Sequence, residues 1–213
     1  LAWLTGFTGS AGFAAVTQDQ AGVFIDGRYR IQVKDQIDTG VFTPVHWPET
    51  DLGDWLSEHL KAGAKVAYDP WLHVSDQVAK LEARLAQDGI SLIPSDNLVD
   101  AIWADQPAPP LGKIDIHPLE FAGETSEIKR QKLAQTLQNN GQRSAVLTAP
   151  DSIAWLLNIR GSDIARTPVA LLFAVLHDDA SLHLFADEKR IDSALAAHLG
   201  ADVTILPEEG FAA

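Results

Sequence analysis

Apolar positions come in short blocks at the start of the chain, and polar turns separate the blocks. Two apolar runs, at 14–17 and 23–25, flank the polar turn 18–20, and this arrangement predicts a β-hairpin. After this hairpin the apolar residues recur every four positions, which is the spacing of one face of a short helix. The residues with that spacing are Tyr29, Val33 and Ile37.

Strand and helix signals alternate as far as residue 93. The predicted strands are 41–45, 66–68 and 90–93. One helix starts at a Thr50 cap and ends before Gly63, and the next starts at a Ser75 cap and ends at Gly89. Their inward-facing positions are Leu52, Trp55, Leu56 and Leu60, then Val74, Val78, Leu81 and Leu85. Strands that alternate with helices after an initial hairpin predict an α/β fold, with a mixed β-sheet flanked by helices.

A proline-rich segment, DQPAPPLG from Asp105 to Gly112, interrupts this pattern. Its prolines deny the backbone regular hydrogen bonds and stiffen an extended conformation. We therefore predict a first domain at 1–106, a linker at 107–117 and a second domain at 118–213. The elements expected in the second domain are a helix from Ser126 to about Asn139, strands at 144–148 and 203–206, and the start of a helix in PEEGFAA at the end of the chain.

An internal repeat links the two halves. The segment LAWLTGFTGS at Leu1 aligns without a gap with IAWLLNIRGS at Ile153, and each copy is followed by strand, turn and strand signals. We therefore predict two duplicated domains. A helix and a strand precede the second copy but not the first, so we expect the first domain to lack its start and the second to lack its end.

Composition and charge narrow the classes of function. Apolar residues make up 46% of the 213 residues and charged residues 21%, which is typical of a globular protein. The formal net charge of -13 disfavours binding to nucleic acid or to anionic membranes. No apolar run approaches the ~20 residues of a membrane-spanning helix, and the first residues lack a signal-peptide pattern. The chain has no cysteine, which excludes disulfides and thiolate chemistry.

Two segments resemble catalytic or ligand motifs but fit structural roles better. The glycine-rich stretch 6–12 lacks the Gly-Lys-Ser/Thr ending of a phosphate loop and precedes a strand, so we favour a tight turn over nucleotide binding. Ser10 is not in a nucleophile elbow, because Thr8 stands where that motif needs glycine. His177, the acidic pair 178–179 and His183 could offer metal ligands, yet a hairpin turn followed by a surface position on a strand explains them better.

The sequence Asp26-Gly27-Arg28-Tyr29 lies where a strand ends and a helix begins, an edge where α/β proteins place ligand-facing groups. The planar guanidinium of Arg28 suits a carboxylate or a peptide carbonyl. A surface salt bridge is an equally good interpretation from spacing alone. The tryptophans on apolar faces, which we expect in the core, are Trp3, Trp55, Trp103 and Trp155.

Several motifs together resemble the Xaa-Pro aminopeptidase family, also called aminopeptidase P, in its long three-domain form. They are WLTGFTGSAG, FIDGRY, NLVDAIWADQPAPP, FAGETSEIKRQKL and AWLLNIRGSDIARTPV, and they occur in the family's order over nearly the whole chain. The resemblance implies two creatinase/prolidase-type N-terminal domains, each a mixed sheet with flanking helices. In that family a further, pita-bread domain carries the chemistry. The chain is then a non-catalytic region that shapes the substrate cleft and the oligomer.

The resemblance also implies where metal and substrate bind. Two divalent metal ions, usually manganese, are held by two Asp, one His and two Glu in the catalytic domain, and none of those ligand motifs occurs in this chain. No catalytic residue and no bound metal are therefore expected here. Asp163 lies in a stretch that looks like one metal motif, but Ser152 stands where the other Asp should be, so we assign Asp163 to the second N-terminal domain.

By motif match, Arg28 would contact the substrate. Asp26 and Tyr29 would orient it, and Asp163 would face the same cleft. The resemblance further implies a cytoplasmic homodimer acting on Xaa-Pro peptides, with no nucleic-acid or membrane partner. Two alternatives stay open: a stand-alone interaction or dimerisation module, and the N-terminal region of a prolidase-like or creatinase-like enzyme.

Overall fold

The computed structural model describes residues 1–212, which divide into two compact units. Unit 1 comprises Leu1–Gln106, and unit 2 comprises the described residues from Pro107 onward. Both contain helices and sheets with parallel and antiparallel strand pairs, so the predicted mixed α/β fold is confirmed. Within the described residues, no helix is long and apolar enough to cross a membrane.

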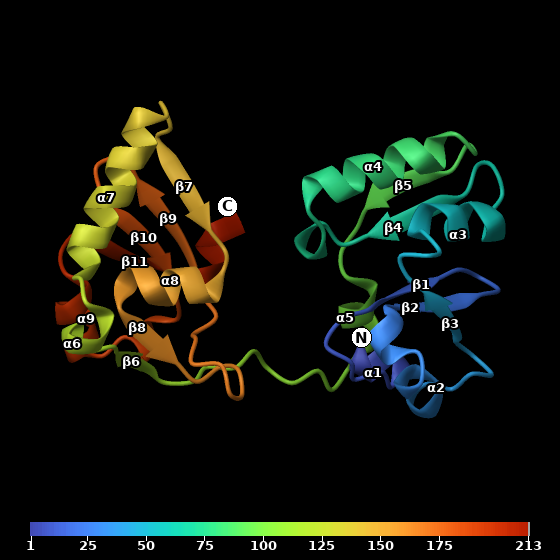
Figure 1. Ribbon diagram of the computed structural model, residues 1–213, viewed down its shortest axis with the longest axis horizontal. Helices are drawn as coiled ribbons and strands as arrows, with labels where there is room; N and C mark the ends of the chain where they lie inside the picture. The colour runs from blue at the N-terminus through green and yellow to red at the C-terminus, as the bar shows by residue number, and fades with distance from the viewer. Residues whose placement is uncertain (213) are drawn as a thin grey trace. The chain divides into compact units, whose positions relative to one another are not determined.

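Unit 1 contains a three-stranded and a two-stranded sheet (Figure 1). Its strands are β1 (Phe13–Val16), β2 (Ala21–Ile25), β3 (Thr43–His46), β4 (Lys65–Tyr68) and β5 (Ser91–Pro94). Its helices are α1 (Ala2–Thr5), α2 (Gln32–Gln36), α3 (Leu52–His59), α4 (Ser75–Ala86) and α5 (Leu98–Ile102), with 3-10 turns η1 (Gly27–Tyr29) and η2 (Pro70–Leu72). Strand β2 pairs antiparallel with β1 and parallel with β3, and β4 pairs parallel with β5. The predicted hairpin and the three later strands are thus confirmed.

Both faces of the β1–β3 sheet are covered in unit 1. Successive strand residues point to opposite faces, so β2 supplies side chains to two clusters. Phe24 packs with Trp55 and Leu85 on one face, whereas Val23 and Ile25 pack with Phe7 and the α2 side on the other. The four-residue period that predicted a short helix here places Val33 and Ile37 in this second cluster.

Unit 2 is built on one four-stranded sheet in the order β11-β10-β9-β7 and a short β6-β8 ribbon. Its strands are β6 (Ile114–Ile116), β7 (Ser144–Leu147), β8 (Ile159–Gly161), β9 (Phe173–His177), β10 (Leu182–Phe185) and β11 (Val203–Leu206). Its helices are α6 (Leu119–Ala122), α7 (Ser126–Asn139), α8 (Pro150–Leu157) and α9 (Ser193–Leu199), with 3-10 turns η3 (Glu188–Arg190) and η4 (Glu208–Ala212). Helices α7 and α8 contact β7 and β9 (Figure 1). The last residue of the predicted terminal helix, Ala213, lies outside the described residues.

The structure corrects the predicted linker and both predicted caps. The linker is shorter than 107–117, because β6 pairs antiparallel with β8 and so belongs to unit 2. Asp51, and not Thr50, caps α3, since its side chain accepts a hydrogen bond of 2.7 Å from the Gly53 amide. Ser75 is the first helical residue of α4 and makes no capping hydrogen bond.

The expectation that the tryptophans lie in the core is correct for Trp55 but wrong for the two tryptophans of the repeat. Trp55 is 5% exposed, whereas Trp3 and Trp155 are 42% and 51% exposed. In α8 the neighbours Ala154 and Leu156 are buried with the rest of the inner face, so Trp155 lies on the outer face. Trp3 instead stacks on Trp103, with ring centroids 4.9 Å apart.

The repeat is also a repeat of structure. Each copy is a helix that ends at a left-handed residue, Gly6 with φ of 80° and Asn158 with φ of 51°. The following residue, Phe7 or Ile159, is 1% exposed. An antiparallel hairpin comes next, and its second strand pairs parallel with a later strand, β3 or β11. The copies therefore share one topology.

We predict that Gly6→Ala destabilises unit 1. An alanine Cβ would lie 2.6 Å from the Gln36 carbonyl oxygen, and φ would stay positive. We expect a loss of about 2–4 kcal/mol in the free energy of unfolding, of which about 1–2 reflects the left-handed backbone and the rest the clash. Urea unfolding measures this loss in the free energy of unfolding. Gly63→Ala is the control, because its φ is 87° but no atom lies within 4 Å of the new Cβ; equal losses in the two variants would contradict the role of the clash.

Candidate functional site

The DGRY segment forms a tight turn where β2 leaves the sheet. Ile25, the last strand residue, is buried, and Asp26 continues in an extended conformation. The Asp26 carboxylate accepts a hydrogen bond of 2.9 Å from the Arg28 backbone amide and so caps η1. The turn presents the Arg28 side chain at the surface, where it is 65% exposed.

Asp26 also holds the Arg28 guanidinium in a two-point ion pair. Arg28 Nε donates to Oδ1 at 3.0 Å, and Nη2 donates to Oδ2 at 2.7 Å. These hydrogen bonds lower the pKa of Asp26 and raise that of Arg28. The guanidinium carbon lies 5.1 Å from the centre of the Tyr29 ring. Its orientation is therefore set by two neighbours, and its Nη1 edge remains to donate to a carboxylate or a carbonyl oxygen.

Tyr29 ties this turn to the glycine-rich loop that follows α1. The Ser10 amide donates to the Tyr29 hydroxyl at 3.2 Å, and the two hydroxyl groups are 2.6 Å apart. The Tyr29 ring packs edge-on against Phe7, with centroids 5.4 Å apart. A Cβ at Gly9 would lie 2.2 Å from the Phe7 ring, so the glycine lets the loop cross that ring. Strand β1 follows the loop, as the structural interpretation predicts.

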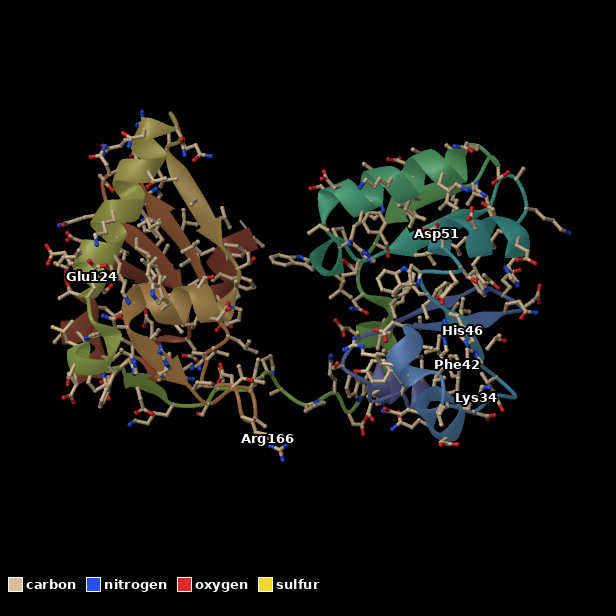
Figure 2. The ribbon with its side chains drawn as sticks, viewed as in Figure 1. Lys34, Phe42, His46, Asp51, Glu124 and Arg166 are labelled. Carbon is tan, nitrogen blue, oxygen red and sulfur yellow. The ribbon has the colours of Figure 1, made fainter. Side chains whose placement is uncertain are left out.

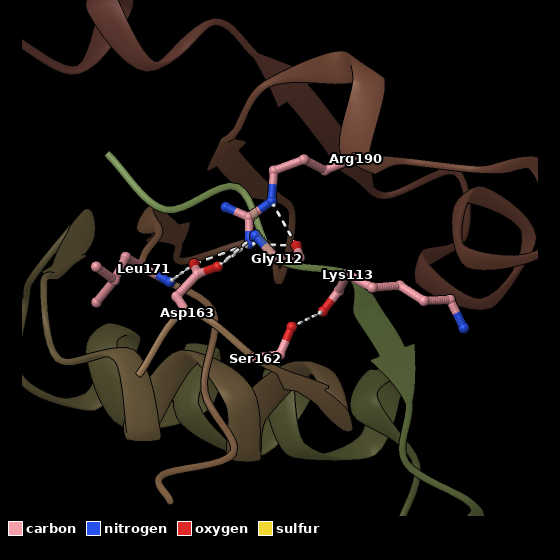
Figure 3. A network of polar contacts seen from close by, with 6 residues as sticks. All are labelled: Gly112, Lys113, Ser162, Asp163, Leu171 and Arg190. Atoms are coloured by element: carbon pink, nitrogen blue, oxygen red, sulfur yellow. Dashed lines mark hydrogen bonds and ion pairs between the residues drawn. The ribbon is translucent and has the colours of Figure 1, made fainter. Parts of the chain in front are cut away.

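Asp163 lies inside unit 2, in a polar network that Figure 3 shows from close by. Its side chain has no exposed area and pairs with Arg190, whose side chain is 4% exposed. It accepts hydrogen bonds from the amides of Gly112 at 2.8 Å and Leu171 at 2.7 Å, and from Arg190 Nη2 at 2.8 and 3.0 Å. Arg190 also donates to the Gly112 carbonyl. This geometry favours a structural role for Asp163, holding the start of unit 2 against the loop after β8.

The two units share a capped 3-10 turn at corresponding positions after the hairpin, and this similarity was not predicted from the sequence. Asp187 caps η3 as Asp26 caps η1. The last residue of each turn then bonds back to the region of the repeat motif: Tyr29 bonds to Ser10, the last residue of the first repeat copy, and Arg190 bonds to Asp163, the residue directly after the second copy. Extending the repeat from its tryptophan motif to the aspartate that follows the hairpin would have identified Arg190 from the sequence.

The remaining candidate residues are the histidines of the β9-β10 hairpin and the loop that follows Asp163. Asp178 and Asp179 form the predicted hairpin turn, and His183 lies on the second strand. Among residues 1–212, no group of three or more His, Cys, Asp or Glu side chains could share a metal ion. Figure 2 shows Arg166 at the outer end of the loop after Asp163, with φ of 66°, unusual for a residue with a Cβ.

Comparison with known proteins places this architecture in a family. The creatinase/prolidase N-terminal domain is matched twice, over residues 1–102 and over residues 105–213. The chain belongs to the creatinase/prolidase N-terminal domain family. The two matches agree with the internal repeat and with the two units, and they confirm the predicted pair of such domains.

Named relatives indicate the enzyme class that carries these domains. The chain is 37% identical over 96% of its length to a probable Xaa-Pro aminopeptidase P of Neosartorya fischeri, and 36% identical over 98% to one of Coccidioides posadasii. The crystal structure of X-prolyl aminopeptidase from Caenorhabditis elegans, described as a cytosolic enzyme with a di-nuclear active site, matches 98% of the chain at 32% identity with a TM-score of 0.91. The chain spans about a third of each of these proteins, at 32%, 34% and 34% of their lengths.

We predict that Ser10→Ala raises the pKa of Tyr29. Hydrogen bonds from Ser10 favour the phenolate and hold this pKa below its ordinary value of 10.0. Because the folded state then releases its proton at lower pH than the unfolded state, the bonds add stability only as pH rises through that range. Absorbance of tyrosinate measures the titration, in a Tyr68→Phe background that leaves one tyrosine. An unchanged titration would show that Ser10 does not control Tyr29.

We predict that Asp163→Asn strongly destabilises unit 2. Removing one partner of a buried ion pair leaves the Arg190 charge uncompensated, at a cost of about 3–5 kcal/mol. Chemical denaturation measures the loss. Asp115→Asn is the matched control, because Asp115 forms an ion pair with Lys113 in which the two side chains are 59% and 75% exposed. Its loss should lower the free energy of unfolding by less than about 1 kcal/mol. A loss at residue 163 as small as the control's would contradict the structural role.

Proposed function

We propose that the chain is the non-catalytic N-terminal region of a metal-dependent Xaa-Pro aminopeptidase, and that Arg28 contacts the peptide substrate. The match to the C. elegans X-prolyl aminopeptidase over 98% of the chain supports the enzyme class. The observation that carries the role of Arg28 is its exposed guanidinium, held by Asp26 at the end of a buried strand.

The geometry suits recognition of a peptide. A guanidinium whose Nε and Nη2 already bond to Asp26 has lost much of its rotamer freedom before a ligand arrives. Its remaining edge can donate to a peptide carbonyl or a carboxylate. Under this proposal, Asp26 and Tyr29 are positioning residues that act through Arg28.

The hydrolytic chemistry would be supplied by two divalent metal ions, which we propose to be manganese, in the catalytic domain of the complete enzyme. The described residues do not fit such a pair, because no group of three or more suitable side chains occurs in 1–212. We therefore assign no catalytic step to this chain. We further propose that the complete enzyme is a cytoplasmic homodimer and that this region contributes to its substrate cleft and its subunit contacts.

The test is hydrolysis of an Xaa-Pro peptide by the complete parent enzyme with manganese, compared with its Arg28→Ala variant. A hydrogen bond to a charged group contributes about 1.5–3 kcal/mol, so we expect kcat/KM to fall about tenfold to a hundredfold. Arg28→Lys should recover only part of this loss, because a lysine ammonium cannot reproduce the planar fork.

Arg84→Ala is the control, because Arg84 is another arginine of unit 1 that pairs with aspartates, Asp54 and Asp88, although its side chain is only 33% exposed. It should leave kcat/KM unchanged. An active parent unaffected by Arg28→Ala would reject the substrate role alone. A parent that does not cleave Xaa-Pro peptides would reject the enzyme class and favour a prolidase-like or creatinase-like parent, or an interaction module.

A further inference from the structure

Two histidines of unit 2 face each other across the β9-β10 hairpin. His183 lies opposite Val175 in the antiparallel register, so His183, Val175 and His177 share one face of the sheet. Their alternating neighbours Leu176, Leu182 and Leu184 are buried on the opposite face. Both imidazoles are half-buried, and the strands rather than the turn fix their positions.

The separation of the two rings matches a metal site better than a hydrogen bond. His177 Nε2 and His183 Nδ1 are 3.4 Å apart, with the ring planes at 75°. A hydrogen bond from a nitrogen donor has a typical length of about 2.9–3.0 Å, so this contact is long. Two zinc–nitrogen bonds of about 2.0–2.1 Å at the tetrahedral angle hold their nitrogens about 3.3–3.4 Å apart.

The surroundings favour a cation. Asp178 and Asp179 follow His177 directly in the hairpin turn. The flanking strands place the uncharged residues Ser144 opposite His177 and Thr204 opposite His183. The nearby Arg143 is paired with Asp178 at 3.2 Å, and the Asp179 carboxylate accepts hydrogen bonds from Ser181, so one guanidinium stands against two carboxylates in this turn.

We propose that His177 Nε2 and His183 Nδ1 bind one zinc ion, or a similar borderline-soft divalent cation, with water in the two remaining tetrahedral positions. Two protein ligands make an open site. The site belongs to this chain, lies within unit 2 and differs in ligand type from the manganese centre proposed for the catalytic domain. Imidazole suits zinc, copper and nickel, whereas manganese prefers oxygen ligands.

The test is calorimetric titration of zinc into the 213-residue chain prepared without a polyhistidine tag. We expect one saturable site. At about ten times the dissociation constant, zinc should raise the Tm of unit 2 by about 5 °C. His177→Gln and His183→Gln should each weaken binding by about tenfold or more, because each removes one of two protein ligands. Manganese should give no comparable binding.

His46→Gln is the control, because His46 is an exposed histidine on β3 of unit 1; it should leave zinc binding intact. Zinc should also shift the ring-proton NMR signals of His177 and His183 and spare those of the other five histidines. Zinc binding that survives both glutamine variants, or no saturable binding at all, would overturn the proposal. The Tm of each variant without zinc shows whether a loss comes from misfolding.

Discussion

A left-handed residue at the end of each repeat helix is the constraint on which both units depend. It reverses the chain so that the next residue, Phe7 or Ile159, enters the core, and the following loop runs back past the sheet. Glycine takes this conformation freely at residue 6.

Asn158 instead bonds through Nδ2 to the Glu124 carbonyl at 2.8 Å and through Oδ1 to Lys129 at 2.6 Å. Lys129 also donates at 2.8 Å to the Trp155 carbonyl, to which the Asn158 amide at the helix end donates only a long bond of 3.4 Å. Burial lowers the pKa of Lys129, and these bonds offset that cost.

After this left-handed residue the two units follow the same backbone path, but they hold it with different side chains. The chain runs through a hairpin to an aspartate-capped 3-10 turn, whose last residue reaches back to the loop after the helix. In unit 1 that residue is Tyr29, an uncharged anchor. In unit 2 it is Arg190, an anchor that needs the buried carboxylate of Asp163. The middle residue of each turn, Arg28 or Lys189, is exposed in both. In both units the last residue of the turn is thus bonded to the rest of its unit, whereas the side chain of the middle residue points to solvent.

The sequence predicted what periodicity controls and missed what depends on contacts between distant residues. Period-two and period-four patterns predicted helices α2, α3, α4 and α7 and the strands other than β6 and β8, because burial of one face selects them. They did not predict the helices α1, α5, α6, α8 and α9. The caps were one residue off at Thr50, since neighbouring Thr and Asp are both good caps and only the geometry chooses. Trp155 looked like core because it is apolar, although its helix buries the opposite face. Arg28 was found from a strand-end motif, whereas the Asp163–Arg190 pair joins residues 27 positions apart, so only the extended repeat, and no local pattern, marks it.

The two arginine–aspartate pairs show why the exposed one is the better candidate for function. In both, the guanidinium donates to the two carboxylate oxygens, from Nε and Nη2 in Arg28 and from Nη2 alone in Arg190, and the shortest contacts are similar, at 2.7 Å for Arg28–Asp26 and 2.8 Å for Arg190–Asp163. The two pairs differ in how far their side chains are buried. An exposed pair is solvated in the folded and the unfolded chain alike, so water and salt cancel most of its attraction and it adds little to stability. The buried pair cannot be solvated when folded, so each partner becomes indispensable to the other. Arg28 is therefore not required for the fold, and its remaining edge is free to contact a ligand, a freedom that Arg190 does not have.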